Sequence, residues 1–414
     1  MSRNDQTGKL WCQHEIINFN RRIFTVHCGN FFNSMRYSKI FFCSLLSLTM
    51  FFSGCQKSEQ EVPVPVEPTR KVVKGVWVTN VASNALDSYD NIKTTVALCK
   101  KSGITDIFVV VWNKGRTLYP SEIMNREFGI PIMEGFAGRD PLKEMITEAH
   151  AVNLKVHAWF EYGFAASYGQ QGGVILKKYP DWAARDKNGA LLTSGNGFEW
   201  MNGINPAVQN FMKSLFVEVV TNYDVDGVQG DDRLPAMPIA GGYDSFTTEL
   251  YKQEKNGATP PLNEKDPNWV SWRSGKLTDF FRDLYSAVKA VKSSVIVSSA
   301  PSTYPFGLDN YLQDWPTWLD KGYCDYVIPQ VYRYDINAYT QTLKQQIDYV
   351  KRTPDRSKFI TGMLIQSGTW TPTEEYLDAM ISTNRNNGIK GEVMFFFEGL
   401  KKNTTYFETK YPVK

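Results

Sequence analysis

Short apolar segments alternate along this chain with longer segments whose apolar residues recur at helical spacing. The short segments are nearly continuous in hydrophobic character, which is typical of strands buried on both faces of a parallel sheet. Alternation of such strands with helices indicates a series of βαβ units. We expect eight strands, at residues 74–79, 106–112, 155–161, 226–231, 295–299, 326–331, 359–365 and 392–397.

The segments between these strands carry recognisable helix starts. Asp140-Pro141 and Asn205-Pro206 each place a capping side chain directly before a proline, a combination favoured at the first turn of a helix. The polar stretch 234–268 contains several Gly and Pro residues and is expected to be a long insertion. We expect helices at residues 89–102, 140–153, 205–223, 269–292, 311–321, 336–353 and 373–387.

Eight strand–helix units match the (β/α)8 TIM barrel, an α/β fold, in number and in size. A doubly wound open sheet is the alternative arrangement of such units. No GxGxxG sequence follows the first strand, so a dinucleotide-binding version of that sheet is not expected. We therefore predict a single TIM-barrel domain over residues 71–414.

The start of the chain has a different character. Residues 1–34 show no sustained period and are expected not to belong to the native product, which would begin at Met35. Residues 35–54 combine a basic start, an apolar run and small residues at the end, the pattern of a secretory signal peptide. The small residues directly before Cys55 resemble a bacterial lipobox, which implies a lipid on this cysteine. An ordinary signal peptide followed by a coincidental cysteine is the alternative.

Residues 55–70 are first polar and then rich in proline, as in a semi-rigid extended tether. Such a tether would hold the barrel away from a membrane. The sequence therefore predicts a cell-envelope protein, anchored by its lipid and placed at the outer membrane.

Composition excludes several classes of partner. The 46 basic and 43 acidic residues nearly balance and form no basic stripe, so nucleic acid is not an expected partner. His150 and His157 show no zinc spacing, and we predict no metal and no cofactor. Cys99 and Cys324 are expected to be buried free thiols, with a single disulfide as the alternative. The protein is expected to be a monomer.

Acidic and aromatic side chains collect where the predicted strands end, the edge of a TIM barrel that carries active sites. Glu161 ends the third strand, and Asp231 and Asp232 end the fourth. These three are the predicted catalytic residues. The predicted substrate-binding residues are Trp77, Asn80, Trp112, Trp159, Tyr162, Arg233, Gln330, Tyr332 and Glu398.

Paired carboxyl groups suit the hydrolysis of a glycosidic bond, in which one protonates the leaving oxygen and the other is a nucleophile or activates water. Glu161 stands between two aromatic residues, where a partly dry setting raises the pKa of an acid. Asp231 would be the nucleophile or base, and Asp232 would orient sugar hydroxyls. Each aspartate could instead cap a helix or brace a loop, and Glu161 could be a structural partner of Arg233 or Arg333. Tryptophan rings would stack on sugars or wall the cleft, and Glu398 could be only an ion-pair partner.

Seven segments together resemble the glycoside hydrolase-like family 10 group of bacterial proteins. The resemblance implies a TIM barrel and a glycosidase role on cell-wall or related polysaccharide; some relatives resemble enzymes that cut peptidoglycan strands lacking stem peptides. The family's Asp-Asp pair falls on Asp231 and Asp232. The chain departs from the family pattern at Glu161, at Gln229 and at Arg233. The matching segments are 75–79, 156–160, 201–206, 223–232, 272–292, 325–332 and 391–396.

Three functions compete at this stage. The first is a lipid-anchored glycoside hydrolase of envelope polysaccharide. The second is a non-catalytic glycan-binding lipoprotein on the same barrel, suggested by the departures around Gln229 and Arg233. The third is a metal-dependent polysaccharide deacetylase, against which the scarcity of histidines argues.

Overall fold

The computed structural model describes residues 72–193, 197–351, 353 and 355–411. The expectations for residues 1–34, for the signal segment 35–54, for lipidation of Cys55 and for the tether 55–70 lie outside the described residues. Within the described part of the chain, no helix combines the length and the apolar character needed to cross a membrane.

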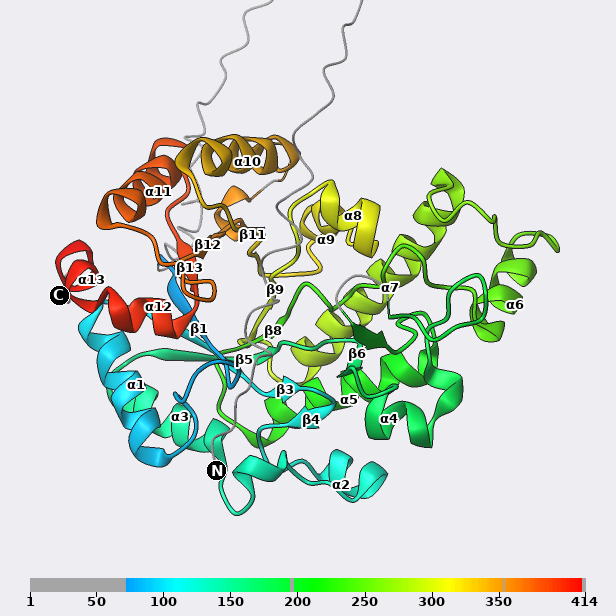
Figure 1. The fold of residues 1–414 in the computed structure, drawn as a ribbon, viewed down its shortest axis with the longest axis horizontal. Helices are drawn as coiled ribbons and strands as arrows, with labels where there is room; N and C mark the ends of the chain where they lie inside the picture. The colour runs from blue at the N-terminus through cyan, green and yellow to red at the C-terminus, as the bar shows by residue number, and fades with distance from the viewer. Residues whose placement is uncertain (1–71, 194–196, 352, 354, 412–414) are drawn as a thin grey trace, which may run out of the picture. The chain divides into compact units, whose positions relative to one another are not determined.

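Parallel strands surrounded by helices make up the described part of the chain (Figure 1). Hydrogen-bonded neighbours follow the order β10-β9-β8-β5-β2-β1-β13-β12-β11, and every pair in this sheet is parallel. The strands are β1 (Lys74–Val78), β2 (Asp106–Val110), β5 (Lys155–Phe160), β8 (Gly227–Gly230), β9 (Ile296–Ser299), β10 (Tyr326–Val327), β11 (Gln330–Val331), β12 (Thr361–Leu364) and β13 (Glu392–Phe395).

The two end members of this order, β10 and β11, are halves of the predicted sixth strand, which is interrupted at Pro329. On one side, the Ile328 N–H donates to the Ser299 carbonyl at 2.8 Å. On the other side, the Ile360 N–H donates to the Val327 carbonyl at 3.0 Å. The sixth strand thus pairs with both of its neighbours, so the sheet closes. The predicted eight-stranded TIM barrel is confirmed.

Helices lie between successive strands, and their first turns are capped as the sequence predicts. The Asp140 side chain accepts a hydrogen bond from Lys143 N at 3.0 Å, and Asn205 accepts one from Ala207 N at 2.9 Å. The helices are α1 (Tyr89–Lys101), α2 (Glu122–Phe128), α3 (Pro141–Ala151), α4 (Gly173–Lys178), α5 (Pro206–Asn222), α6 (Ser245–Glu254), α7 (Pro267–Val291), α8 (Phe306–Tyr311), α9 (Trp315–Asp320), α10 (Ile336–Tyr349), α11 (Glu374–Asn386), α12 (Phe397–Lys402) and α13 (Thr404–Lys410).

Some predicted boundaries were wrong. The expected helix 311–321 is two helices, α8 and α9, because Leu312 adopts a left-handed conformation between them. The expected strand 106–112 stops at Val110, and the chain continues into a small antiparallel pair, β3 (Trp112–Asn113) with β4 (Arg116–Thr117). A second small pair joins β6 (Ala165–Tyr168) to β7 (Phe198–Trp200). Pairings of this kind depend on loop geometry, which the period of hydrophobic residues does not predict.

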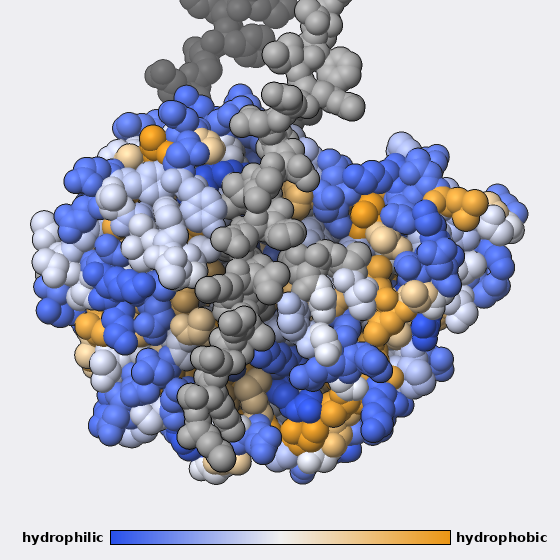
Figure 2. Space-filling view, viewed as in Figure 1, coloured by the Kyte–Doolittle hydropathy of each residue, from blue (hydrophilic) through white to orange (hydrophobic). Residues whose placement is uncertain are grey.

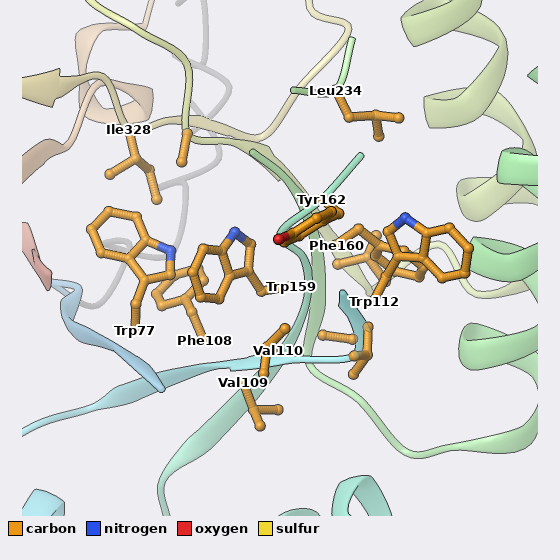
Figure 3. Close-up of a cluster of buried hydrophobic side chains, with 14 of the residues drawn as sticks. Trp77, Phe108, Val109, Val110, Trp112, Trp159, Phe160, Tyr162, Leu234 and Ile328 are labelled. Atoms are coloured by element: carbon orange, nitrogen blue, oxygen red, sulfur yellow. The ribbon is translucent and has the colours of Figure 1, made fainter. Parts of the chain in front are cut away.

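Large rings fill the barrel interior (Figure 3). The ring centroid of Trp77 lies 6.0 Å from that of Phe108 and 6.2 Å from that of Trp159. The indole N–H of Trp77 donates to Gln229 Oε1 at 2.6 Å, and Gln229 Nε2 donates in turn to Ser298 Oγ at 3.1 Å. A hydrogen-bonded link therefore crosses the barrel from β1 to β8 and β9 and closes its interior below the strand ends.

The long insertion is tied to helix α7 by one buried cation. Arg273 is fully buried and donates to three main-chain carbonyls outside its own helix, those of Ile239, Gly241 and Glu264, each at 2.6 Å. Its guanidinium also lies over the Trp269 ring, 4.5 Å from the centroid. Burial lowers the pKa of Arg273 to about 10.

Cys99 and Cys324 are buried and free, as expected. Burial raises the pKa of both thiols, and that of Cys324 reaches about 12. Neither side chain is therefore a ready nucleophile.

A buried carboxylate at the start of β13 joins three elements. Both oxygens of Glu392 accept from Arg385 of α11, at 2.6 and 2.7 Å, and the Tyr411 hydroxyl donates to the same group. Glu392 has no exposed surface, while the Arg385 side chain keeps 35% of its surface exposed. This pair fixes the C-terminal segment to the amino end of the barrel, opposite the strand ends.

We predict that Glu392→Gln lowers the free energy of unfolding by about 2–3 kcal/mol. Loss of a buried partner leaves the other charge uncompensated, and the partial exposure of Arg385 moderates that cost. Denaturant unfolding would measure the change, with Asp90→Asn, in an exposed pair with Lys93, as the control that leaves stability nearly unaltered. Equal stability of Glu392→Gln and the parent protein would contradict the prediction.

Candidate functional site

The predicted catalytic residues follow two neighbouring strands. Glu161 follows β5 and Asp231 follows β8, and these strands pair in register over their last four residues, with Phe160 opposite Gly230. After β8 the chain turns back at once, since the Leu234 N–H donates to the Asp231 carbonyl at 3.0 Å. A Cβ on Gly230 would lie 2.4 Å from the Leu234 carbonyl oxygen, so the turn requires glycine there.

Arg233 is the centre of the site. Its guanidinium contacts Asp231 Oδ2 at 2.9 Å and Asp232 Oδ1 at 2.8 Å. The same group donates twice to the main-chain carbonyl of Glu161, at 3.0 and 2.7 Å. The rings of Phe198 and Tyr162 lie beside it, with centroids 4.8 and 5.5 Å from the guanidinium carbon. Arg233 is buried and thus holds the acids in place, whereas the sequence predicted that it contacts substrate.

The two buried carboxyl groups have different partners. Glu161 Oε2 accepts from Asn113 Nδ2 at 2.7 Å and from Thr79 Oγ1 at 3.1 Å. Asp231 Oδ1 accepts from Gln330 Nε2 at 2.9 Å, while its other oxygen faces the guanidinium described above. Glu161 is therefore held by uncharged donors and Asp231 by an ion pair and an amide.

Thr79 and Asn113 were missing from the predicted site residues. Thr79 directly follows β1 and Asn113 lies in β3, so both stand near strand ends, where the other candidates were found. A prediction that took every polar residue at the end of a strand as a candidate would have included them. Their common partner, Glu161, however, is 82 residues from Thr79 and 48 residues from Asn113 along the chain.

Burial changes the proton affinity of the acids. It raises the pKa of Glu161, and the nearby Arg233 offsets part of this rise. It also raises the pKa of Asp231 well above the ordinary value, and the Asp232 carboxylate adds to the increase. Two carboxylates thus pair with one guanidinium in a poorly hydrated site, and the Glu161 carboxyl group lies close enough to feel its charge. Such a group of acids holds a proton more readily than isolated carboxylates do.

Four of the five predicted aromatic contacts are buried, and the fifth, Tyr332, is half-buried. Trp77, Trp112, Trp159 and Tyr162 each expose 1% or less of their surface. Trp112 donates to the Gly163 carbonyl at 3.0 Å, whereas Trp77 and Trp159 lie in the barrel (Figure 3). None of these four rings is open for stacking on a sugar. The rings instead form the walls and floor of the site, the other role that the sequence suggested.

The remaining candidates lie around this group. Asn80 is half-buried, with its Nδ2 3.4 Å from Met133 Sδ, and the Tyr332 ring lies 5.3 Å from that of Phe395. Glu398 lies in α12, where it accepts from Ser83 Oγ at 2.8 Å and pairs with Lys401 at 3.7 Å. These contacts match the ion-pair alternative for Glu398.

Among the residues that the structure describes, no three His, Cys, Asp or Glu side chains are grouped so that they could hold a metal ion. Asp231 and Asp232 face Arg233 instead.

A parallel barrel with buried acids at the carboxyl ends of neighbouring strands defines a protein of the TIM-barrel glycosidase type. The chain belongs to the glycosyl hydrolase-like 10 family, whose model matches residues 72–367. This confirms the resemblance found in the sequence and supports a glycosidase-type function.

Curated relatives carry names of the same kind. Glycosyl hydrolase DigH of Escherichia coli K12 is 25% identical over 379 residues, which cover 77% of this chain and 81% of the relative. Glycosyl hydrolase YngK of Bacillus subtilis is 25% identical over 334 residues, covering 73% of this chain and 62% of that relative.

Solved structures show the same barrel. The glycoside hydrolase domain of PgaB (BpsB) from Bordetella bronchiseptica superposes with a TM-score of 0.60 at 15% identity, covering 83% of this chain and 98% of that one. The catalytic domain of β-amylase from Paenibacillus polymyxa gives 0.59 at 10% identity, covering 82% and 97%. At sequence identities this low, the superpositions show a shared fold.

We predict that Asp232→Asn lowers the pKa of Asp231, because the substitution removes the neighbouring negative charge that helps to raise it. Carbon-13 NMR of the side-chain carboxyl groups would follow the titration. Asp244, whose pKa is also raised by burial but which bonds to Asn202 and Thr247, is the internal control and should titrate unchanged. An unaltered pKa of Asp231 would contradict this account of the site.

Proposed function

We propose that this protein hydrolyses glycosidic bonds in a polysaccharide of the cell envelope, with peptidoglycan glycan strands as the first candidate substrate. One observation carries the proposal: two residues with buried carboxyl groups, Glu161 and Asp231, follow adjacent strands, and one guanidinium bonds to the main-chain carbonyl of the first and to the carboxylate of the second. The family of the chain supports the reaction class. The envelope location is drawn from the sequence of residues 35–70.

Glu161 is proposed as the general acid. Its side chain accepts hydrogen bonds from uncharged donors, Asn113 and Thr79, and burial raises its pKa. A carboxyl group in this setting can keep its proton until it transfers it to the leaving oxygen. Asp231 is less suited to that role because its carboxylate is ion-paired with Arg233.

Asp231 is proposed as the nucleophile, or as the base that activates water. Arg233 and Gln330 each donate to one of its oxygens, so the orientation of the carboxylate is defined before substrate arrives. Asp232 is more exposed, with 24% of its side-chain surface accessible, and is proposed to orient sugar hydroxyls. The separation of the Glu161 and Asp231 carboxyl groups in a substrate complex would distinguish retention from inversion.

A second candidate is glycan binding without hydrolysis. Both aspartates are ion-paired with the same buried arginine, and such pairing weakens a nucleophile or base. This candidate predicts binding that survives neutralisation of Asp231.

We expect the parent protein to release reducing ends from peptide-free peptidoglycan strands, or from another glycan in a panel of envelope, plant and host polysaccharides. Asp231→Asn should lower the rate by about 100- to 10,000-fold, the contribution of a positioned carboxylate. The control is Asp226→Asn, which changes a carboxylate at the other end of β8 that contacts His150 and Val156 N. Release by Asp231→Asn at the parent rate would exclude the assignment; binding of a glycan by both proteins without release would favour the second candidate.

The pH dependence of the reaction provides an independent prediction. Asp231 must be ionised to act, and burial and the Asp232 carboxylate raise its pKa. As the pH is lowered, activity should therefore begin to fall at a higher pH than it would if Asp231 had the pKa of an ordinary aspartate. Asp232→Asn lowers that pKa and should move the acid limb of the kcat/KM profile to lower pH. Asp279→Asn, which changes an exposed carboxylate on α7 that pairs with Arg282, is the control that should leave the limb in place. A shift to higher pH in Asp232→Asn would be incompatible with the proposed role.

A further inference from the structure

Three partly exposed aromatic rings gather on the loops that follow β11 and β12 and on the first turn of α11. They are Tyr334, Trp370 and Tyr376, here called the rim cluster, and all three are half-buried. The ring centroids of Tyr334 and Trp370 are 4.9 Å apart and nearly perpendicular, and those of Trp370 and Tyr376 are 6.2 Å apart. None of these residues was among the site residues predicted from the sequence.

The rim cluster is held rigidly although it lies at the surface. Ser367 and Trp370 exchange two main-chain hydrogen bonds, at 3.0 and 2.9 Å, which close a tight turn. The Tyr334 hydroxyl reaches Ser367 Oγ at 3.3 Å, and the Tyr376 hydroxyl donates to the Arg333 carbonyl at 2.8 Å. Rings fixed in this way lose little conformational entropy when a ligand binds, which favours a binding role.

The rim cluster is continuous with the acids of the site. Gln330 of β11 donates to Asp231, and Tyr332, two residues further on, packs against Phe395 at the barrel mouth. Tyr334 follows after two more residues. Because an extended chain advances at most about 3.6 Å per residue, Tyr334 lies within about 14 Å of Gln330, the length of a few sugar units.

We infer that the rim cluster is a subsite that stacks on a sugar ring a few units away from the bond to be cleaved. This inference rests on the proposed function and narrows its substrate to long glycan chains. The apolar face of a pyranose packs on indole and phenol rings, while their N–H and O–H groups remain available to polar partners. The tryptophans of the barrel are buried and cannot take this role, whereas Trp370 is half-exposed.

Calorimetric titration would test the subsite with Asp231→Asn protein, so that bound chains are not cut. The probes are peptide-free peptidoglycan strands, as long chains and as disaccharides. Adding Trp370→Ala should weaken long-chain binding about tenfold, the upper range for an aromatic contact, and leave disaccharide binding unchanged. Trp370→Phe, which keeps a ring, should retain most of the affinity. Tyr285→Ala is the control, because Tyr285 lies on α7 and reaches Asp325, which precedes β10, at the opposite end of the barrel.

The outcomes separate this inference from the catalytic proposal. Length-dependent binding through Trp370 without hydrolysis by the parent protein would keep the subsite and reject the hydrolase. Three results would overturn the subsite. They are equal long-chain affinity with and without Trp370, equal losses of affinity for both chain lengths, and no long-chain binding by the Asp231→Asn protein. If Trp370→Ala unfolds at a lower temperature than Tyr285→Ala, the ratio of its long-chain affinity to its disaccharide affinity decides, because a loss of folded protein lowers both affinities equally and the loss of a subsite lowers only the first.

Discussion

One buried guanidinium organises the catalytic end of this barrel. Arg233 contacts the carboxylates of Asp231 and Asp232 and the main-chain carbonyl of Glu161, so it joins the ends of two neighbouring strands. A cation is required there because burial alone would drive protons onto the acids and would make their close approach unfavourable. With a single positive charge for three acids, the site remains able to hold a proton. Any acid–base chemistry at this end depends on that imbalance.

The site is supported from below by a packed interior. The link from Trp77 through Gln229 to Ser298 closes the barrel beneath the acids, and Thr79 and Asn113 fix the orientation of Glu161 from β1 and β3. The layers therefore have different tasks. The apolar and hydrogen-bonded layer gives rigidity, the acids lie above it, and half-exposed rings stand on the loops beyond. This division is typical of TIM barrels, in which strand ends and loops carry function and the interior provides stability.

Much of the architecture was predictable because it depends on local patterns. Continuous apolar segments located the strands, and side chains such as Asp140 and Asn205 marked helix starts that the structure contains. Predictions failed where the outcome depended on tertiary contacts. The pair β3–β4 forms in a loop, and Leu312 divides an expected helix by a single left-handed residue.

The sequence by itself determined the barrel, the order of its strands and the acids at the ends of β5 and β8, because hydrophobic period and strand alternation are properties of neighbouring residues. Only the tertiary structure decided which aromatic residues are buried and which remain accessible, since burial depends on what packs above each ring. It likewise decided that Arg233 faces the acids and that Thr79 reaches Glu161 across 82 residues. Contacts between distant parts of a chain follow from barrel closure and register, which no local pattern encodes.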